Sequence, residues 1–186
     1  TSGLATIEIS SRNGDRIVEE FEKYFNENST NPSSPYKTYI IKAENNSDKI
    51  NKLTEWMDLQ AIRYGHPGAG KILRGFDYQN QIMTNFNLSP DDIIISTFQP
   101  KSRFITTIFE PQSKLVDSLT YDITAWNLIY SYDLKAFAVN ERINVSKKFQ
   151  RAPVQSDVTA TDSKPYAYIF RYKSVKDVAF LSELMK

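Results

Sequence analysis

A glycine-rich stretch, "GHPGAGK" at residues 65–71, matches most of the phosphate-binding loop of nucleotide-hydrolysing enzymes. A working loop also needs a Ser or Thr hydroxyl for magnesium directly after its lysine, and it must open into a helix. Here Ile72 takes the hydroxyl position, Pro67 removes a backbone amide, and the residues that follow alternate like a strand. The sequence therefore predicts a loop followed by extended chain, and no nucleotide site.

The chain has one histidine, His66, and no cysteine. Zinc sites are built from clusters of His, Cys, Asp and Glu, and a serine–histidine relay would have to use this same histidine. No acidic residue lies three positions after His66, and the chain has no Gly-x-Ser-x-Gly elbow. We therefore expect no metal, no cofactor and no catalytic residues in this chain.

Three acidic residues close in sequence leave one enzymatic alternative open. Glu110, Asp117 and Asp122 would supply the carboxylate pair that glycoside hydrolysis needs if they shared a pocket. Acidic residues at such positions more often cap helices, and Asp122 precedes an apolar helical stretch, as a cap does. The cap is the preferred interpretation.

The overall composition is that of a globular domain and excludes some partners. The 186 residues carry a net charge of +1, with 40% hydrophobic and 24% charged side chains. The basic–aromatic runs "FQPKSRF" and "FRYK" are compatible with base stacking, but the balanced charge favours strand packing. No apolar run approaches the roughly 20 residues that span a bilayer. We expect neither a nucleic-acid partner nor a membrane span.

The hydrophobic pattern alternates between helix and strand along the chain. Ile50, Leu53, Trp56 and Met57 form one buried helical stripe, and the continuous apolar run at 93–97 is typical of a strand buried on both faces. The pattern at 71–83 indicates extended or hairpin structure. We therefore predict an α/β fold, a layered and mostly parallel sheet flanked by helices, flavodoxin-like, with a hairpin insertion. Helices are expected at 15–28, 47–58, 100–111, 123–133 and 174–186, and strands at 36–43, 61–65, 93–97, 135–141 and 165–172.

Composition divides the chain into three parts. Residues 1–35 are predicted to be a helix and linker, 36–143 an α/β domain, and 144–186 a polar connector followed by a strand–helix pair. The chain begins without methionine and ends inside a predicted helix. We therefore expect it to be a piece of a longer protein.

One block resembles a known family. "TYDITAWNL" at 120–128, with "QP" at 99–100 and "IFEP" at 108–111, is similar to a segment downstream of the peptidase domain in bacterial carboxypeptidase A-like zinc carboxypeptidases. The stretch at 36–65 resembles the strand–helix–strand unit that precedes this segment. The family pattern departs at 127–129 and at Asp133, where it has Ser-Leu-Pro and Gly. The signature residues, expected to be structural, are Thr120, Tyr121, Asp122, Thr124 and Trp126.

The resemblance implies an accessory role. The family's zinc ligands, a His-x-x-Glu and a later histidine, are absent from this chain, and so is the cysteine nucleophile of the class I glutamine amidotransferase-like fold that the resemblance suggests. It implies a non-catalytic domain of a secreted or periplasmic bacterial protein, with residues 1–35 following a peptidase domain that binds the zinc and is its partner. The alternative is a carbohydrate- or cell-wall-peptide-binding module that uses exposed aromatic residues.

Overall fold

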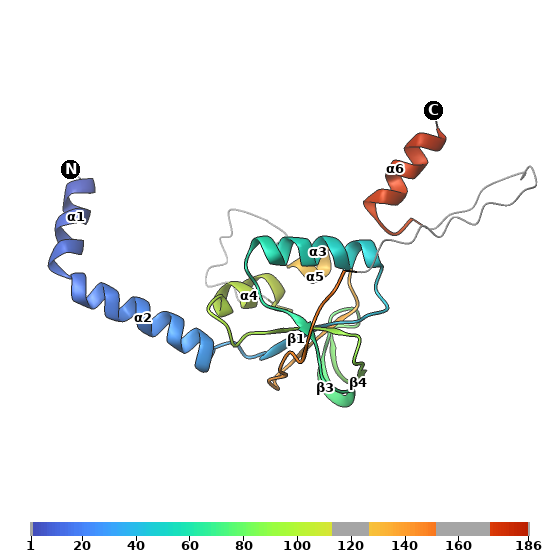
Figure 1. Ribbon diagram of the computed structural model, residues 1–186, viewed down its shortest axis with the longest axis horizontal. Coiled ribbons are helices and arrows are strands. Elements are labelled where there is room, and N and C mark those ends of the chain that lie inside the picture. The colour runs from blue at the N-terminus through green and yellow to red at the C-terminus, as the bar shows by residue number, and fades with distance from the viewer. Residues whose placement is uncertain (1, 113–126, 152–171, 186) are drawn as a thin grey trace, which may run out of the picture.

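The computed structural model describes residues 2–112, 127–151 and 172–185 (Figure 1). Within these residues one seven-stranded sheet runs in the order β4-β3-β6-β1-β5-β2-β7, and every neighbouring pair is antiparallel. The strands are β1 (Thr38–Ile41), β2 (Gly65–His66), β3 (Lys71–Asp77), β4 (Ile82–Leu88), β5 (Ile93–Ser96), β6 (Ala136–Val139) and β7 (Lys147–Lys148). The helices are α1 (Ser2–Arg12), α2 (Gly14–Thr30), α3 (Ser47–Leu59), α4 (Ser102–Phe109), α5 (Leu128–Ser131) and α6 (Val175–Leu184).

The prediction of a mostly parallel, flavodoxin-like or class I glutamine amidotransferase-like sheet is wrong. The strand–helix–strand unit β1-α3-β2 exists, and its two strands run in the same direction, but antiparallel β5 lies between them. In the same way β1 separates β5 from β6. Two interleaved units of this kind give the order β6-β1-β5-β2, the arrangement of the ferredoxin-like split β-α-β fold. The described strands therefore contain no parallel pair.

Helices α3, α4 and α5 cover one face of the sheet (Figure 1). The strand side chains alternate, so Tyr39 and Ile41 of β1 point to this face together with Ile93 and Ile95 of β5. The predicted stripe of α3 meets them, with Leu53 and Met57 completely buried. Because both faces of the sheet are covered, all four residues of β1 are buried.

The β3–β4 hairpin covers the opposite face, and the prediction of a hairpin at 71–83 is confirmed. Leu73 and Leu88 of the hairpin belong to a second cluster built on the other set of strand residues. Phe86 stacks on Phe137 of β6, with ring centroids 3.9 Å apart and planes 6° apart. A Cβ at Gly75 would lie 2.9 Å from the carbonyl oxygen of Ala138 in β6, so the hairpin approaches the sheet at a distance that only glycine permits.

Helices α1 and α2 form an arm that extends away from the sheet (Figure 1). The arm contacts the body at its end, where Asn28 is buried and its side-chain amide donates to the carbonyl oxygen of Pro100 at 3.2 Å. Beside it, Arg103 of α4 lies over the ring of Tyr24, 4.7 Å from its centroid. The boundaries at 35 and 143 stay predictions, although the sheet extends past 143 through β7.

Candidate functional site

The glycine-rich loop has no phosphate-binding geometry. The extended chain predicted after the loop is confirmed, since Lys71 begins β3, but the loop itself is shorter than predicted, because residues 65–66 form β2. The Lys71 ammonium forms an ion pair with Glu141. A Cβ at Gly70 would lie 2.9 Å from the carbonyl oxygen of Leu88, so this glycine serves close packing against β4.

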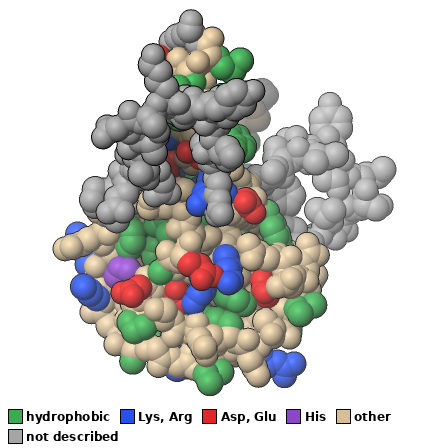
Figure 2. Space-filling model, turned by 90° about the vertical axis from the view of Figure 1, so that its right-hand side faces the viewer, with side chains coloured by type: hydrophobic (Ala, Val, Ile, Leu, Met, Phe, Trp, Pro, Cys, Tyr) green, Lys and Arg blue, Asp and Glu red, His purple; other side chains and the backbone are tan. Residues whose placement is uncertain are grey.

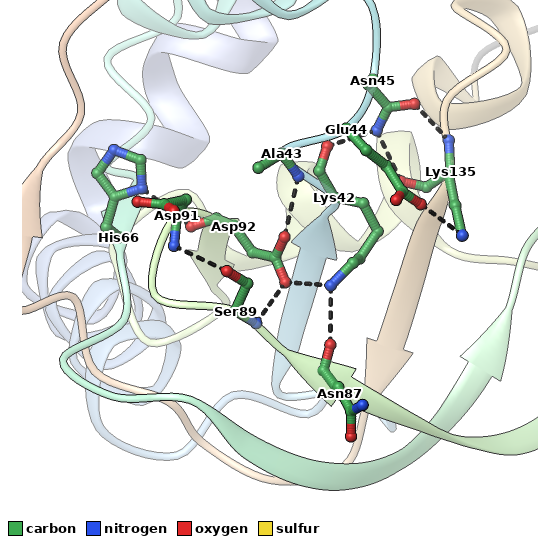
Figure 3. A network of polar contacts seen from close by, with 10 residues as sticks. All are labelled: Lys42, Ala43, Glu44, Asn45, His66, Asn87, Ser89, Asp91, Asp92 and Lys135. Carbon is green, nitrogen blue, oxygen red and sulfur yellow. Dashed lines mark hydrogen bonds and ion pairs between the residues drawn. The ribbon is translucent and has the colours of Figure 1, made fainter.

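Ser89, His66 and Asp92 come together beside this loop (Figure 3), but they are not arranged as a catalytic relay. The His66 Nδ1 atom lies 3.1 Å from the main-chain oxygen of Asp92, whereas a relay needs the carboxylate there. The Ser89 hydroxyl accepts from the backbone amide of Asp91 at 3.3 Å. The imidazole therefore has neither a carboxylate to orient it nor a nucleophile to activate.

The Asp92 carboxylate instead fixes the turn between β4 and β5 to the end of β1 (Figure 3). It accepts from the backbone amides of Ser89 at 2.8 Å and Ala43 at 2.9 Å, and it forms an ion pair with Lys42. The Lys42 ammonium also donates to the carbonyl oxygen of Asn87 at 2.8 Å. Because Asp92 is only 1% exposed, these partners compensate a buried charge, and the cluster is structural.

The proposed carboxylate pair cannot be assembled from the described residues. Glu110 is partly buried at the end of α4, while Asp117 and Asp122 lie outside the ranges that the structure describes. The whole family signature lies there too, namely Thr120, Tyr121, Asp122, Thr124 and Trp126. The roles assigned to these residues stay predictions.

The chain is held firmly on both sides of residues 113–126. Three consecutive carbonyl oxygens, of residues 109–111, accept hydrogen bonds from the Tyr78 hydroxyl, the Asn127 amide and the Tyr130 hydroxyl, respectively. Asn127 also caps α5, because its side-chain oxygen accepts from the backbone amides of Ile129 and Tyr130. Sequence reasoning missed this cluster, since its members are far apart along the chain.

A cavity of about 1300 Å³ lies between the β1–α3 loop and residues 172–176. Most of the charged side chains on its walls are paired: Lys49 with Asp133 at 3.1 Å, and Lys176 with Asp48 at 3.1 Å. Lys135 and Glu44 form a third pair. Because the opposite charges offset one another, the walls offer little electrostatic preference for a charged ligand.

A second cavity of about 700 Å³ is unlike the first, and we call it the β2–β7 groove. Its lining residues are Asp58, Ile62, Arg63, Tyr64, Val145, Ser146, Lys147, Lys148, Phe149 and Arg151. The ring of His66, the one histidine of the chain and therefore the purple side chain in Figure 2, lies beside the groove, with its centroid 5.4 Å from that of Phe149. The groove thus combines four cationic side chains with two aromatic rings and a single acid.

Contacts inside the groove hold its acid and its tyrosine. The Asp58 carboxylate accepts from the Tyr64 hydroxyl at 2.8 Å and forms an ion pair with Arg151. Desolvation raises the pKa of Asp58, but the hydrogen bonds from Tyr64 and Arg151 outweigh it and leave the pKa below its usual value. Desolvation, followed by the adjacent carboxylate, raises the pKa of Tyr64 to about 12. Both groups are therefore fixed in charge at neutral pH.

The arm presents a second surface of interest. The α2 side chains Ile17, Phe21, Tyr24 and Phe25 repeat at helical spacing, with exposed fractions of 49%, 63%, 37% and 37%. The Phe25 ring contacts both other rings, with its centroid 4.7 Å from that of Phe21 and 5.1 Å from that of Tyr24. This stripe continues the contact that α2 makes with the body at its end.

Searches of known proteins leave the family open: no family model, curated protein or solved structure matches this chain. Among the described residues, no group of three or more His, Cys, Asp or Glu side chains is placed to hold a metal ion. Within the same ranges, no helix combines the length and the apolar character that a membrane crossing requires.

Proposed function

We propose that this chain is a non-catalytic accessory domain of a secreted or periplasmic zinc carboxypeptidase-like protein. The family block at 120–128 and the missing zinc ligands motivate the proposal. In this arrangement the zinc is bound by the peptidase domain, and the chain described here supports that domain or shapes access to its cleft. The α/β layout of the class I glutamine amidotransferases is not part of the proposal.

The single observation that carries the proposal is the exposed apolar stripe of α2. A helix in water that leaves Phe21 63% exposed and Ile17 49% exposed retains apolar surface that a partner would bury. The stripe is continuous with the contacts of Asn28 with Pro100 and of Tyr24 with Arg103 of α4, so a domain packed there would extend an existing interface. The occupant we assign is the peptidase domain of the same polypeptide.

The proposal is tested by producing the peptidase domain and this chain as separate polypeptides and measuring their affinity by calorimetry. Phe21→Asp is expected to weaken binding roughly tenfold or more, because interface aromatics of this kind carry much of the binding energy. Ile72→Asp is the matched control, since Ile72 is 74% exposed on β3, away from the arm, and its substitution is expected to leave binding unchanged.

Two outcomes would contradict the accessory role. The first is the absence of any association, or equal weakening by both substitutions. The second is zinc-dependent release of C-terminal residues by this chain on its own, because that would make it the enzyme.

A ligand-binding module is the second candidate, and the β2–β7 groove favours it. Tyr64 and Phe149 line the groove, with ring centroids 5.9 Å apart. Aromatic side chains in such a cavity offer apolar contact area for a carbohydrate or a cell-wall peptide. This function uses a different surface from the arm, so the two candidates can be tested separately.

A further inference from the structure

The β2–β7 groove has an excess of positive charge. Its one acid, Asp58, is occupied on both oxygens, by the Tyr64 hydroxyl and by Arg151. Within the described ranges, no ion pair is formed by the remaining three cations, Arg63, Lys147 and Lys148. Three cations that form no ion pair with the described residues surround one cavity, and they favour a ligand that carries several negative charges.

The aromatic rings of the groove do not form a flat platform. Tyr64 and Phe149 are tilted by 54°, and His66 and Phe149 by 46°, so each ring presents part of its surface to another ring. Bases and sugars are usually held by stacking on an open ring face. The cluster instead provides an apolar floor onto which an aliphatic or aromatic side chain can pack.

The open edge of the sheet adds a third feature. Strand β7 is the last strand in the order, and nothing in the part of the chain described here pairs with its outer edge. Backbone groups on such an edge can bind an added strand, which is how many domains hold extended peptides. A glycan has no backbone that matches this edge. The open edge of β7, the positive charge of the groove and its apolar floor together favour a peptide as the ligand.

Gly65 holds β7 in this position. A Cβ at Gly65 would lie 2.5 Å from the carbonyl oxygen of Lys147 and 2.5 Å from the Cγ1 atom of Val145. Any side chain here would push β7 away from β2, so the absence of one sets the shape of the groove.

We propose that the β2–β7 groove binds an extended acidic peptide segment, which adds to the sheet along β7. Its carboxylates contact Arg63, Lys147 and Lys148, and an apolar side chain between them packs on Tyr64 and Phe149. The inference develops the second candidate function and is independent of the arm.

The test uses a fluorescein-labelled eight-residue peptide of alternating Glu and Val, with the same peptide carrying Gln for Glu as the comparison. Fluorescence anisotropy at low salt is expected to show binding of the Glu peptide only. Arg63→Gln/Lys147→Gln/Lys148→Gln is expected to weaken binding roughly tenfold, because each exposed ion pair contributes modestly. Lys23→Gln/Lys49→Gln/Lys101→Gln removes the same charge elsewhere and is expected to leave the affinity nearly unchanged.

Amide chemical shifts measured by NMR separate strand addition from general attraction. Upon addition of the Glu peptide, the largest changes are expected at residues 146–149 and at 65–66. Circular dichroism of each variant shows whether it has folded, and Lys147→Gln alone provides a milder substitution if the triple variant has not.

The proposal is overturned if the Gln peptide binds equally well, if both triple variants bind alike, or if the amide shifts lie away from β7. It is also overturned if a poly-dT oligonucleotide or an oligogalacturonate binds the groove more tightly than the peptide, since the ligand would then belong to another class. Loss of arm docking in the Phe21→Asp variant has no bearing on these outcomes.

Discussion

At the scale of single residues, a few buried polar groups decide how the chain closes. Asp92 connects the β4–β5 turn to the end of β1, and Asn127 connects the start of α5 to the end of α4. Neither role follows from the sequence, because each depends on a partner brought close by the fold. In the sequence, Asn127 stood out only as a departure from a family pattern.

Replacing Asp92 by Ala is expected to lower the free energy of unfolding by about 3–5 kcal/mol, since removing one member of a buried ion pair leaves the other charge uncompensated. The Lys42 side chain is 13% exposed, and two backbone amides would also lose their acceptor. Urea unfolding at pH 7 measures the loss. Asp91→Ala is the matched control at the neighbouring exposed position and should change the stability by less than about 0.5 kcal/mol. Equal effects would show that the Asp92 contacts contribute little.

At the scale of elements, the spacing of apolar residues along the chain predicted several helices and strands. Helical spacing of apolar residues predicted α2 and α3, the apolar runs predicted β1 and β5, and the alternation after Lys71 predicted the hairpin. Each of these signals is local, since it depends only on which side chains share a face. The β2–β7 groove was missed because residues 144–163 were interpreted as a polar connector. The pairing of Lys147 and Lys148 with β2, some 80 positions earlier, leaves no local signal.

The hairpin depends on one glycine. Gly75→Ala is expected to destabilise the protein by about 1–3 kcal/mol, the usual range for overpacking, because the new Cβ would lie 2.7 Å from Val139 Cγ1 and 2.9 Å from the Ala138 oxygen. Urea unfolding followed by circular dichroism measures this change. At Gly14 a Cβ would meet nothing within 4 Å, so Gly14→Ala is the matched control and should not destabilise. An unchanged Gly75→Ala variant would mean that β3 can shift freely on β6.

At the scale of the whole molecule, the order of the strands could not be predicted. Alternation of strand and helix gives the connections, but it does not say which strands become neighbours. The split arrangement is consistent with every local pattern that suggested a parallel sheet. It also buries the sheet face that RRM domains use to stack bases, because the β3–β4 hairpin lies over it.

Buried tyrosines link the stability of the whole fold to alkaline pH. Burial raises the pKa of Tyr39 to about 12 and that of Tyr78 well above its usual value. Both hydroxyls lose their protons first in the unfolded chain, near pH 10, so their stabilisation is complete below about pH 10 and is lost as the pH rises towards 12. Each is expected to lower the free energy of unfolding by about 1.4 kcal/mol per pH unit in this window.

Urea unfolding at a series of pH values between 9 and 12 checks this dependence. Tyr39→Phe should reduce the slope of the free energy of unfolding against pH by the contribution of about one proton. At pH 7 the substitution should leave the stability nearly unchanged, because the buried Tyr39 hydroxyl has no hydrogen-bond partner among the described residues. Tyr172→Phe removes a side chain that is 72% exposed and serves as the control. If the pH dependence of the free energy of unfolding is the same in the Tyr39→Phe variant, the buried Tyr39 hydroxyl is not its source.

The interleaved strand order also bears on how the protein is made. A chain leaving the ribosome presents β1 and β5 early, but β1 must wait for β6, about a hundred residues after it, before its second edge is filled. Among the described strands, the β3–β4 hairpin pairs with the rest of the sheet through β6, so this backbone pairing cannot form until the same moment. Closing such long loops is slow. We expect the nascent chain to expose an open sheet edge through much of its synthesis, the period in which chaperones would be of most use to it.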